Sequence, residues 1–357
     1  MKKLLLILTT LILPVFSFSQ SGGYGVYNFL NLTNSARLAS LGGHNISVYN
    51  DDLNFAAQNP ALLNSLNNNK LSLNYIDYFA GINFGYTAYA RDFGKLGTFA
   101  GGIHYINYGK FISAEENGII NGEFKASDYA LNLIWAKEVY KNIRAGINLK
   151  PIFSNLESYN SFGIALDLGI SYVNNEKEFC ASLVAKNIGF QINPYYEGHY
   201  EKLPFEVQVG VSKKLAHAPF RVSLTGQKLN RWNLLYDTEE EITSISFATD
   251  TDTSKGEVLY DFLDNSFRHM VIGVDIILMK SFYASIGYNH LRHQELKITD
   301  KAGLTGFSWG FGVTLKKIGI NYARSSYHLA GGSNHFSLQF DISQFNKTKS
   351  VEIIKNE

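Results

Sequence analysis

The feature that most constrains this chain is a period-two alternation of large apolar residues with small or polar ones between residues 70 and 342. Successive side chains of a β-strand point to opposite faces, so this pattern predicts strands with one apolar face. The clearest case is 306–315, whose apolar positions are Phe307, Trp309, Phe311, Val313 and Leu315. The same rule divides the chain into fourteen expected strands: 70–79, 81–91, 96–108, 126–137, 141–153, 161–174, 178–188, 203–215, 219–229, 267–278, 281–289, 304–316, 318–327 and 333–342.

The lengths and the composition of these segments favour a membrane barrel. Most reach the about nine to eleven residues with which a tilted strand crosses a bilayer, and single-chain bacterial barrels have an even strand number. Charged residues make up 18% of the chain, below the about 25% usual in soluble domains, and mean hydropathy is −0.09. We therefore expect an all-β fold, a 14-stranded antiparallel transmembrane β-barrel. Composition alone leaves a large soluble β protein as the alternative.

Other features of the sequence exclude several functional classes. A formal net charge of +1 gives no electrostatic reason to expect a nucleic-acid partner. The single cysteine, Cys180, excludes a disulfide framework and a cysteine-built zinc site, and we expect it to be a packed thiol within a strand. The chain has no Gly-rich phosphate loop, no nucleophile elbow and no zinc-binding helix motif. We expect no enzymatic activity and no cofactor.

The connections between the expected strands suggest an orientation in the membrane. Every second connection is short, whereas several of the others are long, so the two kinds fall at opposite ends of the strands. Residues 1–19 resemble a cleaved signal peptide, with Lys2 and Lys3 before an apolar stretch. The first strand would then start in the periplasm, in the outer membrane of a Gram-negative type of cell. The long loops, 109–125, 189–202, 230–266 and 290–303, would be extracellular.

The segment before the first strand does not alternate. Residues 20–69 hold a possible short helix, with Asn34 or Ser35 as the N-cap and Gly42-Gly43 as the stop, followed by a turn at Asn59-Pro60. A fourteen-stranded barrel is wide enough to need filling, so we expect this segment to be an N-terminal plug; a free periplasmic arm is the alternative. The expected domains are a signal peptide (1–19), a plug (20–69), a barrel (70–342) and a periplasmic C-terminal tail (343–357).

Two motifs in this segment carry a resemblance to a known family. The run 35–43, which contains Ser35, Arg37, Gly42 and Gly43, is followed by Asn59-Pro60-Ala-Leu, and this arrangement resembles the FadL-like barrels and their PorV relatives. Longer stretches are similar to the PorQ-like members of the type IX secretion system: 73–79, 102–111, 214–221, 229–232, 267–269 and 327–332. That resemblance implies a non-enzymatic secretion subunit that holds a surface-exposed, PorZ-like protein of the attachment complex, with other secretion components as further partners. The alternative is a FadL-like channel for hydrophobic small molecules, which predicts an apolar pocket beneath the long loops and a movable plug.

The longest expected loop is strongly acidic. Between residues 231 and 266 it holds nine acidic residues against two basic ones. Aromatic and arginine side chains are favoured anchors at interfaces, and acidic patches steer basic partners. We therefore hypothesise that this loop docks the surface partner through Arg231, Trp232, Asp237, Glu239, Glu240, Glu241, Asp250 and Asp252. A solvated loop without a partner is the alternative, and the same carboxylates leave a surface calcium site open.

Two further sets of polar residues have structural interpretations. His290 and His293 lie in an expected loop, where we predict solvated side chains rather than metal ligands. Three aspartates, together with Arg91 and Lys137, are expected to face the lumen and to form ion pairs across it: Asp128, Asp167 and Asp275.

Overall fold

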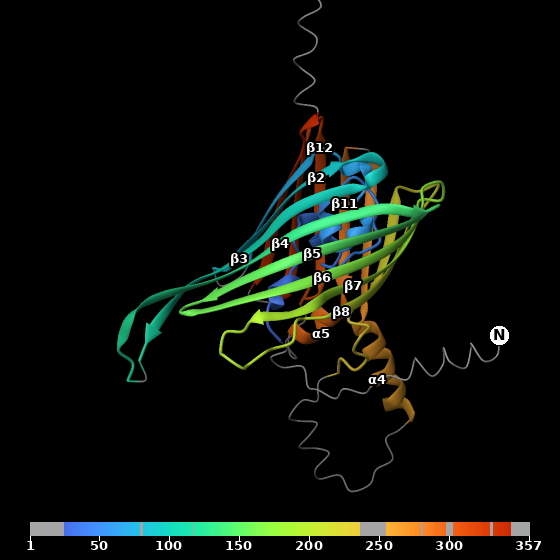
Figure 1. Cartoon of the computed structure of the whole chain (residues 1–357). Helices are drawn as coiled ribbons and strands as arrows, with labels where there is room; N and C mark the ends of the chain where they lie inside the picture. The colour runs from blue at the N-terminus through green and yellow to red at the C-terminus, as the bar shows by residue number, and fades with distance from the viewer. Residues whose placement is uncertain are drawn as a thin grey trace, which may run out of the picture.

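Backbone hydrogen bonds join each strand to its neighbours in the sequence, and β14 pairs back to β1, which closes an antiparallel barrel (Figure 1). The computed structural model describes residues 25–78, 81–115, 117–235, 255–279, 281–297, 303–328 and 331–343. The strands are β1 (Lys70–Asp77), β2 (Asn83–Asp92), β3 (Thr98–Ala114), β4 (Ile120–Tyr140), β5 (Ile143–Leu156), β6 (Tyr159–Asn174), β7 (Phe179–Asn193), β8 (Glu206–Lys214), β9 (Phe220–Gly226), β10 (Met270–Met279), β11 (Phe282–Asn289), β12 (Phe307–Leu315), β13 (Ile318–His328) and β14 (Gly331–Asp341). The prediction of a fourteen-stranded antiparallel barrel is confirmed.

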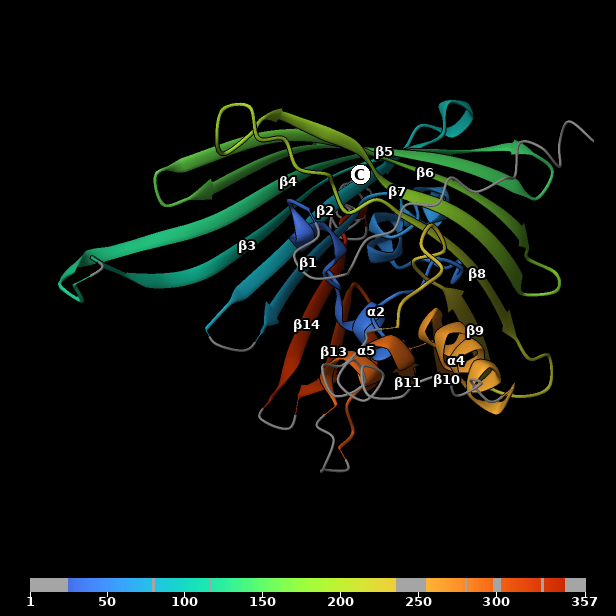
Figure 2. The same ribbon diagram turned by 90° about the horizontal axis from the view of Figure 1, so that it is seen from below.

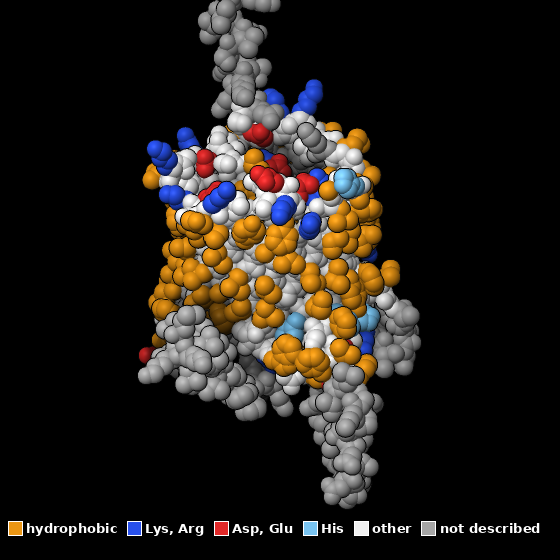
Figure 3. Space-filling view, turned by 90° about the vertical axis from the view of Figure 1, so that its right-hand side faces the viewer, with side chains coloured by type: hydrophobic (Ala, Val, Ile, Leu, Met, Phe, Trp, Pro, Cys, Tyr) orange, Lys and Arg blue, Asp and Glu red, His pale blue; other side chains and the backbone are white. Residues whose placement is uncertain are grey.

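The alternation in the sequence separates the two faces of the barrel wall. Along β5, the outward side chains of Ile147 and Leu149 are exposed, whereas the inward side chains of Arg144, Asn148 and Lys150 are buried. Figure 3 shows the result on one side of the barrel as a broad band of apolar side chains, with charged side chains gathered at one end. Lipid contacts the apolar outward face of the wall, and the plug must supply partners for the polar groups of the inward face.

The two ends of the barrel differ in their connections. The turn end carries the start of β1, the end of β14 and the short connections β2–β3, β4–β5, β6–β7, β8–β9, β10–β11 and β12–β13. The opposite end, the loop end, carries the long connections. Strand length also differs around the wall, because β3 to β7 have 14 to 21 residues and β8 to β12 have 7 to 10. That the loop end faces the exterior remains a prediction.

One expected loop is mostly sheet. β3 continues to Ala114 and β4 begins at Ile120, so the predicted loop 109–125 forms a hairpin that extends well beyond the barrel (Figures 1 and 2). A β-bulge between Asn107 and Lys110 precedes the projecting part. The prediction was wrong because two strands can pair with each other after their outer neighbours have ended. Stacking of Phe111 on Phe124, with ring centroids 5.2 Å apart, supports that pairing.

Two other expected loops contain helices. α4 (Lys255–Arg268) lies in the connection between β9 and β10, and α5 (His290–Leu296) follows β11 directly. Their side chains meet at Asp264, which accepts hydrogen bonds from Arg268 at 2.7 Å and pairs with His290 at 3.0 Å. Within the described residues, no helix has the length and the hydrophobicity that a bilayer span requires.

Residues 25–69 lie inside the ring of strands, as the view along the barrel shows (Figure 2), and are called the plug below. The plug contains η1 (Asn28–Asn31), α2 (Ala36–Ser40), η2 (Leu53–Ala57), η3 (Pro60–Leu62) and η4 (Ser65–Asn67). Ser35 caps α2 by accepting a hydrogen bond from the Leu38 amide at 3.5 Å. The helix ends before Gly42 and Gly43, both at positive φ, and a Cβ on Gly42 would lie 2.5 Å from Val271 of β10. The glycine therefore permits both the turn and the contact with the wall.

Candidate functional site: the plug and the lumen

The Asn59-Pro60 turn presses the plug against β5 and β6. The amide of Asn59 donates to the carbonyl of Ile46 at 2.7 Å and to the hydroxyl of Ser171 at 3.0 Å. A Cβ on Gly146 would lie 2.3 Å from the carbonyl carbon of Pro60, and a Cβ on Gly169 would lie 2.3 Å from Asn59 Oδ1. The wall thus has glycine at two positions where this turn of the plug occupies the space of a side chain.

Arginine side chains fasten the plug at two other points. Arg144 of β5 is buried and donates to the carbonyls of Ala61 at 3.2 Å and Leu63 at 2.6 Å. Arg37 of α2 lies 3.4 Å from Asp275 of β10, and its guanidinium stacks over the ring of Tyr283, 3.9 Å from the centroid. All these contacts are noncovalent.

Part of the lumen wall, on β1 to β6 in the loop-end half, carries apolar side chains. The wall residues of this region are Ile76, Phe84, Ile106, Ala130, Ile152 and Ala165, from β1 to β6. They pack against four residues of the plug, Val26, Tyr27, Phe29 and Leu30. We call this set the lumen cluster; each of its members is at most 7% exposed. Because barrel lumens are ordinarily polar, an apolar stretch of inner wall is an unusual property that a packed plug segment now covers.

A polar layer lies next to the lumen cluster, towards the turn end. Lys150 of β5 and Asp167 of β6 form a buried ion pair with a 2.6 Å separation. Lys186 of β7 donates to Gln58 of the plug at 2.7 Å, and Asn187 donates to Asn31 at 3.0 Å. These bonds connect the plug to the wall across the width of the lumen.

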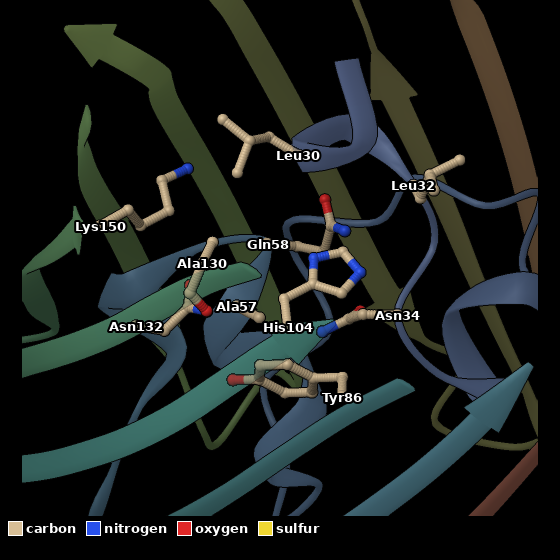
Figure 4. A pocket seen from close by; sticks show the side chains of 10 residues that line it. All are labelled: Leu30, Leu32, Asn34, Ala57, Gln58, Tyr86, His104, Ala130, Asn132 and Lys150. Atoms are coloured by element: carbon tan, nitrogen blue, oxygen red, sulfur yellow. The ribbon is translucent and has the colours of Figure 1, made fainter. Parts of the chain in front are cut away.

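A small cavity lies where this polar layer meets the lumen cluster (Figure 4). Its volume is about 20 Å³, which is room for one or two water molecules. Leu30, Leu32, Asn34, Ala57 and Gln58 of the plug line one side, and Tyr86, His104, Ala130, Asn132 and Lys150 of the wall line the other. Apolar and polar side chains therefore both line the cavity.

A second, larger cavity opens at the turn end between α2 and the wall from β9 to β14. Its volume is about 290 Å³, close to the lower size of ligand-binding pockets. Its lining includes both charged and aromatic residues, among them Arg37, Asp52, Lys70, Arg221, Phe282 and Tyr283. From the loop end to the turn end, the lumen therefore contains first the lumen cluster, then the polar layer and finally this open chamber.

Lumen charges find partners that the sequence did not indicate. Asp275 pairs with Arg37 and, at 3.5 Å, with Arg221, while Asp128 accepts from Tyr108 at 2.7 Å and from Ser154. Arg91 and Lys137 are exposed, so the prediction that they face the lumen was wrong. The side chains of the preceding residues, Ala90 on β2 and Ala136 on β4, point into the lumen. Because side chains alternate along a strand, Arg91 and Lys137 point outward.

The residues of the docking hypothesis are only partly within the described chain. Trp232 is exposed at the loop end and stacks on His269, with ring centroids 5.2 Å apart, and Arg231 lies beside it in the sequence. Asp237, Glu239, Glu240, Glu241, Asp250 and Asp252 lie outside the described residues, as do residues 1–24 with the expected signal peptide and residues 344–357 of the tail. The docking role stays a prediction.

The histidine prediction was wrong in one respect. His290 and His293 are half-buried rather than solvated, because His290 pairs with Asp264 and His293 bonds to the carbonyl of Thr305 at 2.8 Å. In the described residues, no group of three or more His, Cys, Asp or Glu side chains is arranged to hold a metal ion. Cys180 is buried, as predicted.

Docking of the plug should weaken in mild acid because of His44. Burial lowers the pKa of His44 to about 4, against the opposing effect of Glu206 and with help from Lys186, Arg292 and Lys228. In a released plug the pKa returns to about 6.5, so the released form binds the proton first as the pH falls from about 6.5 to about 4. The protection factors of residues 25–69 in hydrogen exchange, which divide out the intrinsic pH dependence of amide exchange, should therefore be lower at pH 5 than at pH 7.5.

The matched variant for this prediction is His44→Gln. It should show less difference between the two pH values than the wild type. Burial raises the pKa of Asp52, so protonation of this residue in acid favours the docked plug, opposite to the effect of His44. Asp52 is present in both proteins, so its effect cancels in the comparison. An equal difference in the two proteins would contradict the role of His44.

Comparison with known proteins identifies the fold. Neither a family model nor a curated protein matches the sequence. The ΔS2 mutant of the TodX monoaromatic hydrocarbon channel matches with a TM-score of 0.51 and 12% identity, over 87% of this chain and 97% of that one. The fold is that of a FadL-like barrel. Two further FadL-like barrels align at lower scores: the Pseudomonas putida toluene transporter TodX (TM-score 0.48, 12% identity, 87% and 97% covered) and a Pseudomonas aeruginosa FadL homologue (0.47, 9%, 90% and 100%).

These findings correct the functional prediction. A secretion subunit of type IX was expected, but the solved structure that shares the FadL-like fold is described as a monoaromatic hydrocarbon channel. The comparison favours the alternative prediction of an uptake channel, and it gives the PorQ-like assignment no support.

Proposed function

We propose that this protein is an outer-membrane channel through which small hydrophobic molecules pass, with the plug as its movable barrier. The observation that carries the proposal is the lumen cluster. Its wall residues, such as Phe84, Ile106 and Ile152, are apolar on the inner face of a barrel, where water-soluble cargo would favour polar side chains. When the plug segment 26–30 moves away, an apolar ligand takes its place against these residues.

The route of the ligand follows from the positions of the two cavities and the cluster. With the loop end outside, a ligand first meets the lumen cluster and then the polar layer around Lys150 and Asp167. It leaves through the chamber at the turn end, beside Arg37. Displacement of the plug is necessary because the space in the polar layer holds only a water or two.

The test is uptake of radiolabelled toluene by Gram-negative cells that produce the full-length protein, compared with cells that do not. Toluene should enter the producing cells faster. Phe84→Ser and Ile152→Ser should lower the added rate about three- to tenfold, because the loss of one large apolar contact weakens ligand binding by about 1 kcal/mol. Ile192→Ser is the matched control, since Ile192 lies on the outward face of β7 and is 47% exposed.

The outcome against the proposal is equally clear. If wild-type protein adds nothing to toluene uptake while it is present in the membrane as a folded barrel, the channel function is rejected. If the lumen variants and the Ile192→Ser control lose the same share of the rate, the lumen cluster is not the path.

A further inference from the structure

The cavity at the floor of the lumen cluster contains polar atoms that have no hydrogen-bond partner. Both side-chain polar atoms of Asn34, the hydroxyl of Tyr86 and Nε2 of His104 are buried and unpartnered. The three residues are 3%, 2% and 6% exposed. Figure 4 shows the His104 ring between the side chains of Gln58 and Asn34, with the ring of Tyr86 beside them. An unpartnered buried polar group costs about 1–3 kcal/mol, so several of them around one cavity indicate a site for a hydrogen-bonding group.

The charges around the cavity balance. Among the described residues that line it, Lys150 is the one charged residue, and Asp167 lies 2.6 Å from its ammonium group. The nearby Lys186 is opposite Glu206 in the ladder between β7 and β8. Each of these lysines already has a carboxylate neighbour, so an anionic group would meet no uncompensated positive charge here. A neutral donor or acceptor could instead bond to an amide, a hydroxyl and an imidazole. The site therefore suits a neutral polar group.

The apolar neighbours of this site are side chains of the plug that a ligand can replace. The ring of Phe29 lies 5.6 Å from the ring of His104, and Leu30 lines the cavity directly. Both belong to η1, whose preceding residue, Tyr27, has a left-handed backbone with φ 59°. This conformation is unfavourable for a tyrosine, so a movement of η1 would relieve backbone strain at Tyr27. A hydrophobic body in the place of Phe29 and Leu30 would put an attached polar group next to His104 and Asn34.

We propose that this cavity binds the neutral oxygen-bearing group, a hydroxyl or a carbonyl, of a small hydrophobic ligand whose apolar body replaces Phe29 and Leu30. The inference rests on the proposed channel function and narrows its ligand class. The channel prefers neutral oxygenated aromatic or aliphatic molecules to plain hydrocarbons of the same size, and it discriminates against the corresponding carboxylates.

Binding of three related probes to the purified full-length protein in detergent tests this proposal. Calorimetry with naphthalene, 1-naphthol and 1-naphthoate compares no polar group, a neutral one and an anionic one on the same body. We expect wild-type protein to bind 1-naphthol about tenfold more tightly than naphthalene, as one satisfied buried hydrogen bond provides, and 1-naphthoate more weakly than 1-naphthol.

Variants assign the preference to the cavity. His104→Leu and Asn34→Leu should each reduce the preference for 1-naphthol to about twofold or less, and His104→Gln, which keeps a donor, should retain part of it. His335→Leu is the matched control, because His335 is an equally buried lumen histidine on β14 that does not line the cavity. Resistance of each barrel to heat unfolding in detergent verifies that the variants are folded.

The possible failures are distinguishable. Wild-type protein that binds none of the three probes overturns the channel function and this inference with it. Equal binding of naphthalene and 1-naphthol, unchanged in the variants, leaves the channel but means that the cavity holds water only, which overturns the inference. Tighter binding of 1-naphthoate than of 1-naphthol overturns the neutral ligand class.

Discussion

Replacing Gly146 with leucine should make the barrel leaky. A Cβ at this position would already lie 2.3 Å from Pro60 and 2.4 Å from the amide nitrogen of Ala61, so a leucine side chain leaves no place for the Asn59-Pro60 turn. The plug would then lose its contacts with β5 and β6, and a fourteen-stranded barrel without a seated plug is a wide pore. We expect single-channel recordings in planar bilayers to show a conductance at least about tenfold above the closed level of the wild type.

Gly101→Leu is the control for this prediction. Gly101 lies on the outward face of β3, and a Cβ there meets nothing within 4 Å. Its conductance should equal that of the wild type. If Gly146→Leu were folded and as tightly closed as the wild type, the Asn59-Pro60 contact would not be what keeps the plug in place.

A disulfide between the plug and β8 should have the opposite effect and stop transport. A Cβ on Gly210 would lie 3.4 Å from Cβ of Ser47, close to the 3.5–4.5 Å found across disulfides. Ser47→Cys with Gly210→Cys, in a Cys180→Ser background, should therefore cross-link under oxidising conditions, and only the side chain of Ile46 must move. Since the ligand can pass only when the plug moves, added toluene uptake should fall at least about tenfold and return with a reductant.

Each single cysteine variant serves as the control for the cross-link and should respond to neither treatment. Full transport through a barrel whose disulfide is shown by mass spectrometry to be formed would mean that the ligand passes a fixed plug. In that case the path would run along another side of the lumen.

The barrel was predictable from the sequence because alternation reports the one property that lipid imposes on every strand, an apolar outward face. It gave the strand number and the connections between strands. It did not give the hairpin of β3 and β4, since Phe111 and Phe124 stack on each other beyond the wall and no lipid or neighbouring strand imposes a pattern there. The helices α4 and α5 were missed because they lie in connections between strands, where the alternation rule makes no prediction.

Important residues of the lumen were not found from the sequence, although a signal was present. Arg144 and Lys150 occupy inward positions of a strand whose outward positions are Ile147 and Leu149, and a charge at an inward position marks a contact with whatever fills the barrel. Their partners could not be named, because the carbonyl of Ala61 meets Arg144 across 83 residues of chain. The secretion role rested on resemblance alone, and no pattern of residues supported it.

The uneven height of the wall has a consequence for the surrounding bilayer. β9 has only seven residues, and at a tilt of about 45° it rises roughly 16 Å, well short of the about 25 Å apolar band of outer-membrane barrels. Elsewhere in the same wall, β5 to β7 have 14 to 16 residues and are long enough to cross the whole band. Lipid tails next to β9 must shorten or tilt to match the wall. The bilayer should therefore be thinner on the side of α4, and the barrel axis should tilt toward that side.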